Sequence, residues 1–101
     1  IGWAIENYTE KNNFNVIKGL TGHGVGFVLH EDPVVYNYGR KGEGMVMKPG
    51  LVLAIEPMIA IGSGDIRQKA DDSFVTRDRS LSAHFEHTIA ITEKGFEILT
   101  K

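Results

Sequence analysis

The 101-residue sequence contains no cysteine, which excludes both a disulfide framework and a thiolate metal site. It also contains no apolar run near the roughly 20 residues that a membrane-spanning helix requires. Neither sign of charge dominates, because 13 acidic and 11 basic residues are interspersed and the formal net charge is −2. This balance offers no basic surface for a nucleic acid or an anionic membrane. Since the lack of cysteine suits a reducing compartment, we expect a cytoplasmic protein.

The residues that are present are ordinary for a globular protein, with 42% hydrophobic and 24% charged side chains. The length allows one domain at most. The chain has no initiator methionine, and Ile1 enters an amphipathic pattern directly. We therefore expect residues 1–101 to form a single partial domain taken from a longer protein.

The spacing of hydrophobic residues predicts one helix followed by strands. Ile1, Ala4, Ile5 and Tyr8 recur at helical spacing, which predicts the end of an amphipathic helix over residues 1–12. The other expected elements are a short strand at 14–17, a break at 32–33, a loop at 36–44, a hairpin-type turn at 62–65, a turn at 71–72, a long strand at 82–92, a turn at 93–95 and a closing strand at 96–99. This order predicts an α+β fold.

Glu56 lies in the most apolar run of the chain, LVLAIEPMIAI at residues 51–61, which should be buried on both faces. A buried carboxylate needs a cation, a hydrogen-bond donor or a raised pKa, because leaving it unpaired costs several kcal/mol. A functional role would explain Glu56, and so would an ion pair with Arg67 or Arg79.

Two further positions are unusual, although each has an ordinary explanation. Alternation along 82–92 places His84, Glu86 and Thr88 on one face of a strand, which is also typical of a solvated sheet face. His23 lies between glycines, which let the backbone approach another group closely. A lone histidine there is also common in loops. His30 follows seven residues later.

Four blocks, however, occur together and in order: GHGVG, LHEDP, KPGLVLAIEPM, and SLSAHFEHTIAIT followed by a glycine and EILT. In this order and at these separations they resemble the C-terminal half of the type I methionine aminopeptidases, which are metallopeptidases of the pita-bread fold. The resemblance covers residues 22–100, and the predicted helix also fits it. It implies half of a pita-bread fold, a mostly antiparallel curved sheet with one helix.

In that family two divalent metal ions share five protein ligands. The resemblance implies that His23 and Glu56 bind one ion and that Glu86 bridges both. One imidazole with several carboxylates suits Co, Mn, Fe or Zn. Two such ions hold a bridging hydroxide that attacks the scissile carbonyl, and they polarise that carbonyl. Glu56 would also relay the proton of the attacking water.

The resemblance also implies residues that contact the substrate. His30 matches the catalytic histidine that hydrogen-bonds the substrate around the scissile amide. Leu29 matches a hydrophobic wall of the methionine pocket, where phenylalanine is frequent in the family. His84 occupies a position that is often glutamine, and we expect it to lie beside the ligands or to face solvent rather than to bind the metal.

The departure from the family pattern lies upstream. The other two ligands are aspartates of the N-terminal half, which also carries a further substrate-binding histidine. The aspartates of this chain are expected in turns and do not match that motif: Asp32, Asp65, Asp71, Asp72 and Asp78. We therefore expect the fragment alone to be inactive, and to pair with the missing N-terminal half or to self-associate through an unpaired sheet edge.

The function that the resemblance implies is metal-dependent removal of methionine from the N-terminus of nascent proteins. One alternative is a peptidase of the same fold that acts at Xaa–Pro bonds. The sequence around Glu56-Pro57-Met58 and Glu86-His87 favours the methionine aminopeptidases. Another alternative is a non-catalytic binding module of this fold. Such modules usually lose ligands, whereas this chain retains three.

Overall fold

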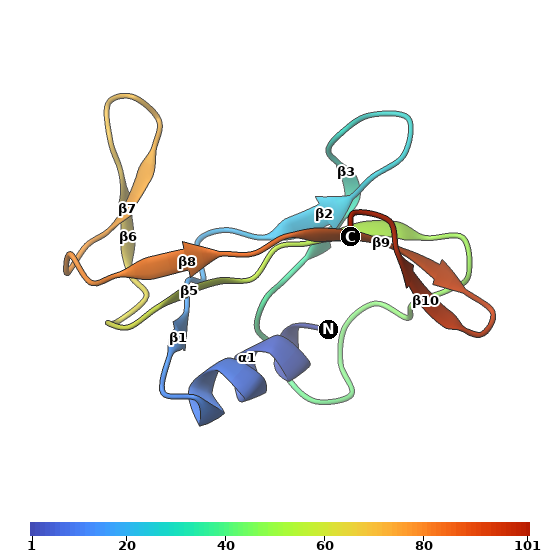
Figure 1. Cartoon of the computed structure of the whole chain (residues 1–101), viewed down its shortest axis with the longest axis horizontal. Helices are drawn as coiled ribbons and strands as arrows, with labels where there is room; N and C mark the ends of the chain where they lie inside the picture. Colours follow the sequence, from blue (N-terminus) through green and yellow to red (C-terminus); the bar gives the residue numbers. More distant parts are fainter.

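The computed structural model describes residues 1–101, which form one helix and ten strands (Figure 1). The helix α1 spans Gly2–Lys11, close to the predicted 1–12. The strands are β1 Asn15–Val16, β2 Gly22–Gly24, β3 Glu31–Val35, β4 Val52–Ile55, β5 Met58–Ala60, β6 Ile66–Gln68, β7 Phe74–Thr76, β8 Ser82–His84, β9 His87–Thr92 and β10 Gly95–Ile98.

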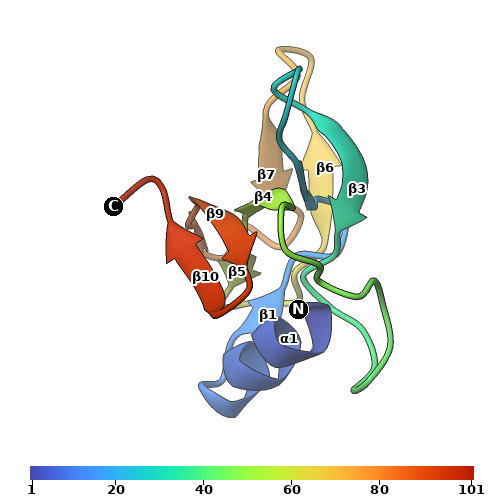
Figure 2. The same ribbon diagram turned by 90° about the vertical axis from the view of Figure 1, so that its right-hand side faces the viewer.

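All strand pairs are antiparallel. They form a five-stranded sheet in the order β10-β9-β4-β2-β3, a three-stranded sheet in the order β1-β5-β8, and a separate hairpin of β6 and β7. The helix lies on one side of the strands, next to β1 (Figure 2). The predicted α+β class with one helix and a mostly antiparallel sheet is confirmed. The helix, ten residues long, lacks the length and the apolar character to cross a membrane.

Two neighbouring segments of the chain, β4–β5 and β8–β9, each run from one sheet into the other. Both segments are interrupted at the same level. β4 pairs with β9, β5 pairs with β8, and the register is the same on both sides of the interruption. The gaps Glu56–Pro57 and Phe85–Glu86 therefore face each other, so that Glu56 lies opposite Glu86. The Phe85 N–H donates to the Pro57 carbonyl at 3.1 Å, while Pro57 itself has no N–H to return.

Three expectations from the sequence are wrong. The segment 82–92 is not one strand, because it is interrupted at Phe85–Glu86, where its partner changes from β5 to β4. The chain does not break at Asp32–Pro33, because β3 runs through it and Asp32 lies in a strand rather than a turn. β3 is the edge of its sheet, where a proline removes no ladder bond. Residues 62–65 do not close a hairpin, because β5 before them pairs with β1 and β8, and β6 after them pairs with β7.

The core is small for a chain of this length. Only 13 of 101 residues are buried, and the run at 51–61 is buried only in part, at Leu53, Ala54, Met58 and Ala60. The accessible surface is 7281 Å², whereas a monomeric protein of this mass exposes about 5,700 Å². The radius of gyration is 14.3 Å, against about 13 Å for a self-contained domain of this length. The fold thus leaves an excess of about 1,600 Å² in contact with solvent.

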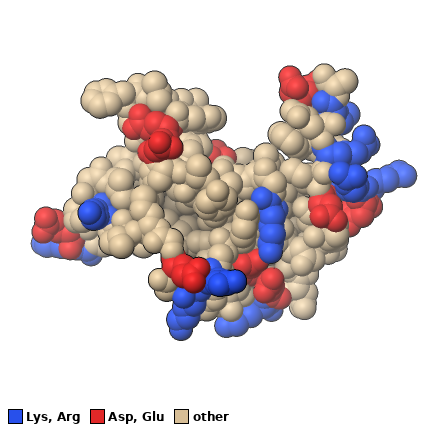
Figure 3. All heavy atoms as spheres, turned by 180° about the vertical axis from the view of Figure 1, so that it is seen from behind, with Lys and Arg blue, Asp and Glu red and all other residues tan.

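The charged side chains do not cover this surface evenly. Seen from behind, they gather along the lower edge and on the projecting loops, and the surface between the β6–β7 hairpin and the β2–β3 loop is largely uncharged (Figure 3). Large hydrophobic side chains are exposed in the β2–β3 loop, on α1 and on β10, among them Phe27, Trp3 and Phe96.

Candidate metal centre

His23 reaches the site because β2 lies unusually close to its neighbours. His23 pairs with Ala54 of β4. Its side chain therefore lies on the same sheet face as that of Glu56, which follows Ala54 by two residues. A Cβ at Gly22 would run into the Ala54 carbonyl oxygen, and a Cβ at Gly24 would run into the backbone of β3. The register between β2 and β3 also shifts between His23 and Gly24. The flanking glycines therefore serve the close packing of this short strand.

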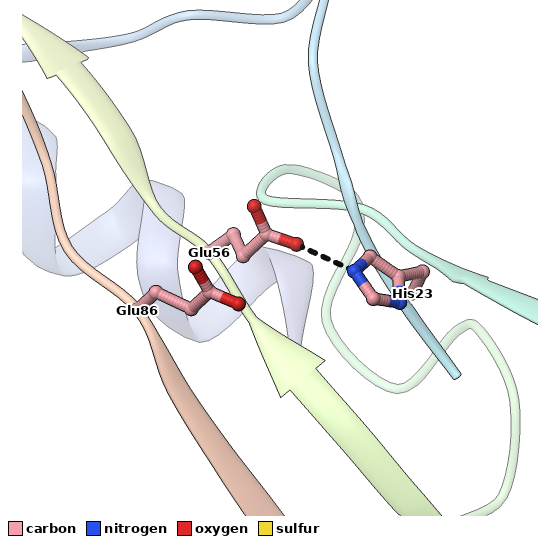
Figure 4. A group of neighbouring side chains, drawn as sticks. All are labelled: His23, Glu56 and Glu86. Atoms are coloured by element: carbon pink, nitrogen blue, oxygen red, sulfur yellow. Dashed lines mark ion pairs between the residues drawn. The ribbon is translucent and has the colours of Figure 1, made fainter. Parts of the chain in front are cut away.

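Three side chains converge from three different segments (Figure 4). His23 comes from β2, Glu56 from the gap between β4 and β5, and Glu86 from the gap between β8 and β9. One ligand atom from each lies within 4.8 Å of the others. Two ligands of one ion, at bond lengths of about 2.1 Å, lie at most about 4.2 Å apart. A small movement of Glu86, which is exposed, would therefore bring all three onto one ion.

The proton position on His23 favours a cation in this site. Its Nδ1 lies 2.8 Å from the Gly24 carbonyl oxygen, which can only accept, so Nδ1–H is the donor. In the neutral ring the lone pair of Nε2 then faces Glu56 Oε1 at 3.0 Å. Two acceptors at this distance repel each other unless a metal ion or a second proton lies between them. A backbone carbonyl that orients a ligating imidazole in this way is usual in metal sites. The donor set of one imidazole and two carboxylates fits Mn, Fe, Co or Zn.

Two more histidines border the three side chains. His84 Nε2 lies 3.3 Å from Glu56 Oε2, so each oxygen of this carboxylate faces an imidazole. The ring of His30 packs against that of His23, with centroids 4.0 Å apart and planes tilted by 53°. Leu29 is the one predicted site residue that the structure leaves outside this group, because it stands exposed on the loop that carries His30.

The ordinary explanations can now be compared with the geometry. Glu56 pairs with His23 and His84, and neither Arg67 nor Arg79 contacts it. Glu86 is exposed, as the alternative of a solvated sheet face requires, and it also lies beside Glu56.

Asn37 is a residue of the site that the sequence analysis missed. It is fully buried, and its Nδ2 donates to the Glu56 backbone carbonyl at 2.8 Å. This bond holds the chain where the interruption between β4 and β5 leaves the ladder incomplete. Its Oδ1 is buried without a partner. Nothing in the surrounding sequence, Tyr-Asn-Tyr, distinguishes a buried asparagine from one in a polar turn. The loop predicted at 36–44 favours the polar turn.

Known proteins are similar to this chain in sequence over its whole length. The chain is 51% identical to methionine aminopeptidase of Rickettsia prowazekii (strain Madrid E), covering 99% of this chain and 39% of that protein. It is 52% identical to methionine aminopeptidase 1 of Bacillus subtilis (strain 168), covering 100% of this chain and 41% of that protein. The chain therefore spans about two fifths of the length of these relatives.

Solved structures agree with the sequence matches. The crystal structures of methionine aminopeptidase from Rickettsia prowazekii and from Thermotoga maritima each match with a TM-score of 0.95, at 49% and 51% identity. Each match covers 99% of this chain and 41% of the solved one, and it confirms the predicted pita-bread-like fold. The family model described as Metallopeptidase family M24 matches residues 1–93. By this match over nearly its whole length, the chain belongs to metallopeptidase family M24.

Proposed function

We propose that the protein containing this chain removes the N-terminal methionine from peptides, using divalent metal held in part by His23, Glu56 and Glu86. The observation that carries the proposal is the convergence of His23 Nε2 and Glu56 Oε1 at 3.0 Å, with a ligand atom of Glu86 within 4.8 Å, in a chain of a metallopeptidase family. The substrate follows from the relatives at about half identity, which are named methionine aminopeptidases.

Membership of this family implies the use of divalent metal. A divalent ion supplies Lewis-acid activation of water and of the scissile carbonyl. We propose two ions of Co, Mn, Fe or Zn, with Glu86 shared between them. The exposure of Glu86 supports this, because a carboxylate on the open side of the site can offer its two oxygens to different ions.

Glu56 is the residue that we propose to move the proton. Its side chain is 13% exposed and lies between the imidazoles of His23 and His84. A carboxylate held in this way can accept a proton from the attacking water and deliver it to the departing amine. His30, packed on His23, would hydrogen-bond the scissile amide. Leu29, exposed on the same loop, would contact the methionine side chain of the substrate.

We further propose that this chain does not act alone. Three donor residues fall short of the five that a site of this family would use. The excess surface of about 1,600 Å² on this chain is also about twice the roughly 800 Å² that each partner buries in a standard protein interface, which is the range of large, permanent interfaces. The N-terminal half of the same enzyme, with two aspartate ligands, would cover it, and self-association would use the same surface. The substrate would be a nascent protein in the cytoplasm.

Expression of the longest natural reading frame that contains this chain tests the proposal. The protein is stripped with EDTA, reloaded with Mn or Co, and given Met-Ala-Ser and Xaa-Pro peptides. We expect free methionine from the first peptide only, and no release after Glu56→Gln. Glu97→Gln on β10 is the control and should keep full activity. Release from the Xaa-Pro peptide alone would refute the methionine assignment, and metal binding without cleavage would indicate a binding module.

A further inference from the structure

The side chain of His84 has no role in the metal set proposed above, yet it lies 3.3 Å from Glu56. We propose that His84 is a positioning residue whose Nε2–H donates to Glu56 Oε2 and thereby holds Oε1 toward His23. The inference rests on the proposed metal role of Glu56. It assigns His84 to the orientation of a ligand rather than to metal binding or to solvent.

Apart from the two imidazoles, few groups fix the orientation of Glu56. It lies in the two-residue gap between β4 and β5, and the one side chain that bonds its backbone there is Asn37, through the carbonyl. No lysine or arginine pairs with its carboxylate. With three rotatable side-chain bonds, the carboxylate could turn Oε1 away from His23, and a donor on Oε2 prevents that rotation.

Donation to Glu56 fits His84 better than metal binding does. The three residues whose ligand atoms lie within 4.8 Å of one another are His23, Glu56 and Glu86, and His84 is not among them. The contact of His84 is with Oε2, whereas Oε1 faces His23. His84 would therefore act through the carboxylate.

No other charged group competes for the ring. His84 is half-exposed and lines a cavity of about 360 Å³ whose other nine lining residues are uncharged, most of them hydrophobic. Its cross-strand partner is Met58. Glu56 is the only carboxylate within ion-pair distance of this imidazole.

The first measurement is made without metal, on the longest natural protein that contains this chain. Nitrogen-15 NMR of the histidine rings, in mildly alkaline buffer where imidazoles are neutral, reports which ring nitrogen carries the proton. We expect the proton of His84 on Nε2, and we expect Glu56→Ala to shift the His84 ring signals. The signals of His87, which bonds Thr100 Oγ1 at 3.1 Å, should stay unchanged. A proton on His84 Nδ1, or His84 signals that ignore Glu56→Ala, would overturn the inference.

The second measurement is the affinity for Mn or Zn by calorimetry. His84→Ala should weaken binding about tenfold, the lower end of what loss of a residue that orients a ligand brings. His84→Gln should bind nearly as tightly as wild type, because its amide can still donate to Glu56. His87→Ala is the matched control and should leave the affinity unchanged.

The outcomes are distinguishable. Wild-type affinity in His84→Ala, equal losses in His84→Ala and His84→Gln, or an equal loss in His87→Ala would each overturn the inference. If the wild type binds no metal, the proposed function fails, while the NMR result still decides whether His84 holds Glu56. If His84→Ala does not fold, the NMR result and His84→Gln carry the test.

Discussion

Replacing Glu86 by glutamine should change stability in opposite directions with and without metal. In the metal-free protein, Glu56 and Glu86 face each other across the strand interruption with oxygens at most 4.8 Å apart. Two like charges about 4 Å apart repel by about 1 kcal/mol in water and about 4 kcal/mol near a protein surface. Because Glu86 is exposed and screened, the lower value applies. Glu86→Gln should therefore raise the free energy of unfolding by about 1 kcal/mol in EDTA.

With metal the order should reverse. At a free metal concentration of 100 times Kd, binding to the native state adds about 2.7 kcal/mol to the stability of the wild type. If loss of the Glu86 ligand weakens binding about a hundredfold, the same concentration adds only about 0.4 kcal/mol. The variant should then be less stable than the wild type by about 1 kcal/mol, despite its advantage in EDTA.

Urea denaturation followed by circular dichroism measures both differences, in the longest natural protein that contains the chain. Glu97→Gln is the matched control, because Glu97 is an exposed glutamate on β10 outside the site. It should behave as wild type in both buffers. The reasoning is refuted if Glu86→Gln lowers stability in EDTA, or if metal stabilises the variant as much as it stabilises the wild type.

Three other predictions concern the frame around the site. Hydrogen bonds from Ser80 and neighbouring amides lower the pKa of Asp78 from 3.8 to about 2. Its contribution to stability is therefore complete above about pH 4 and is lost as the pH falls toward 2. Asp78→Asn should remove this pH dependence, and hydrogen exchange of the amides bonded to Asp78 would measure the change. Gly22→Ala pushes a Cβ into a β4 carbonyl, so it should lower the free energy of unfolding by more than about 1 kcal/mol and weaken metal binding. Gly19→Ala is the control, because its Cβ meets only a flexible side chain. Equal effects of the two variants in calorimetry would contradict this. Leu53 is fully buried in β4, so Leu53→Ala should lower the free energy of unfolding by about 2–5 kcal/mol. A decrease below about 1 kcal/mol in urea denaturation would show that β4 is not part of the core.

The three residues that converge in the structure were predicted together from the four ordered blocks, and two of them also stand out locally. A carboxylate in the run at 51–61 conflicts with burial, and a histidine between two glycines suggests a close backbone approach. The structure shows the physical reason for each. Glu56 lies at the point where the apolar run passes from one sheet to the other, and the glycines beside His23 let β2 fit between β3 and β4. Local chemistry singled out Glu56 and His23 because the anomaly and its cause lie within a few residues, whereas Glu86 was found only through the resemblance.

The interruption of the strands could not be predicted in the same way, because it depends on pairing between distant segments. Alternation along 82–92 shows which side chains share a face, but it carries no information about the partner strand. The partner changes from β5 to β4 at Phe85–Glu86, opposite Pro57, whose missing N–H is one reason the ladder stops there. Asn37 was missed for the same reason, since its bond to the Glu56 carbonyl joins residues 19 positions apart.

His84 and Glu86 lie on the same face, as predicted, although the predicted strand boundary was wrong. The register explains why. Because the pairing is the same before and after the interruption, His84 and Glu86 keep the relation to Glu56 that an unbroken ladder would have given them. The interruption changes the freedom of the backbone. Only the Phe85–Pro57 hydrogen bond crosses it, so the two glutamates can adjust toward a shared ion. An insertion of one residue on each side of Glu56 would offset it by one position from the register of both β4 and β5 and move it from its place opposite Glu86. It should therefore abolish metal binding in calorimetry even if circular dichroism shows the strands intact, and retained affinity would show that the register is not what brings the ligands together.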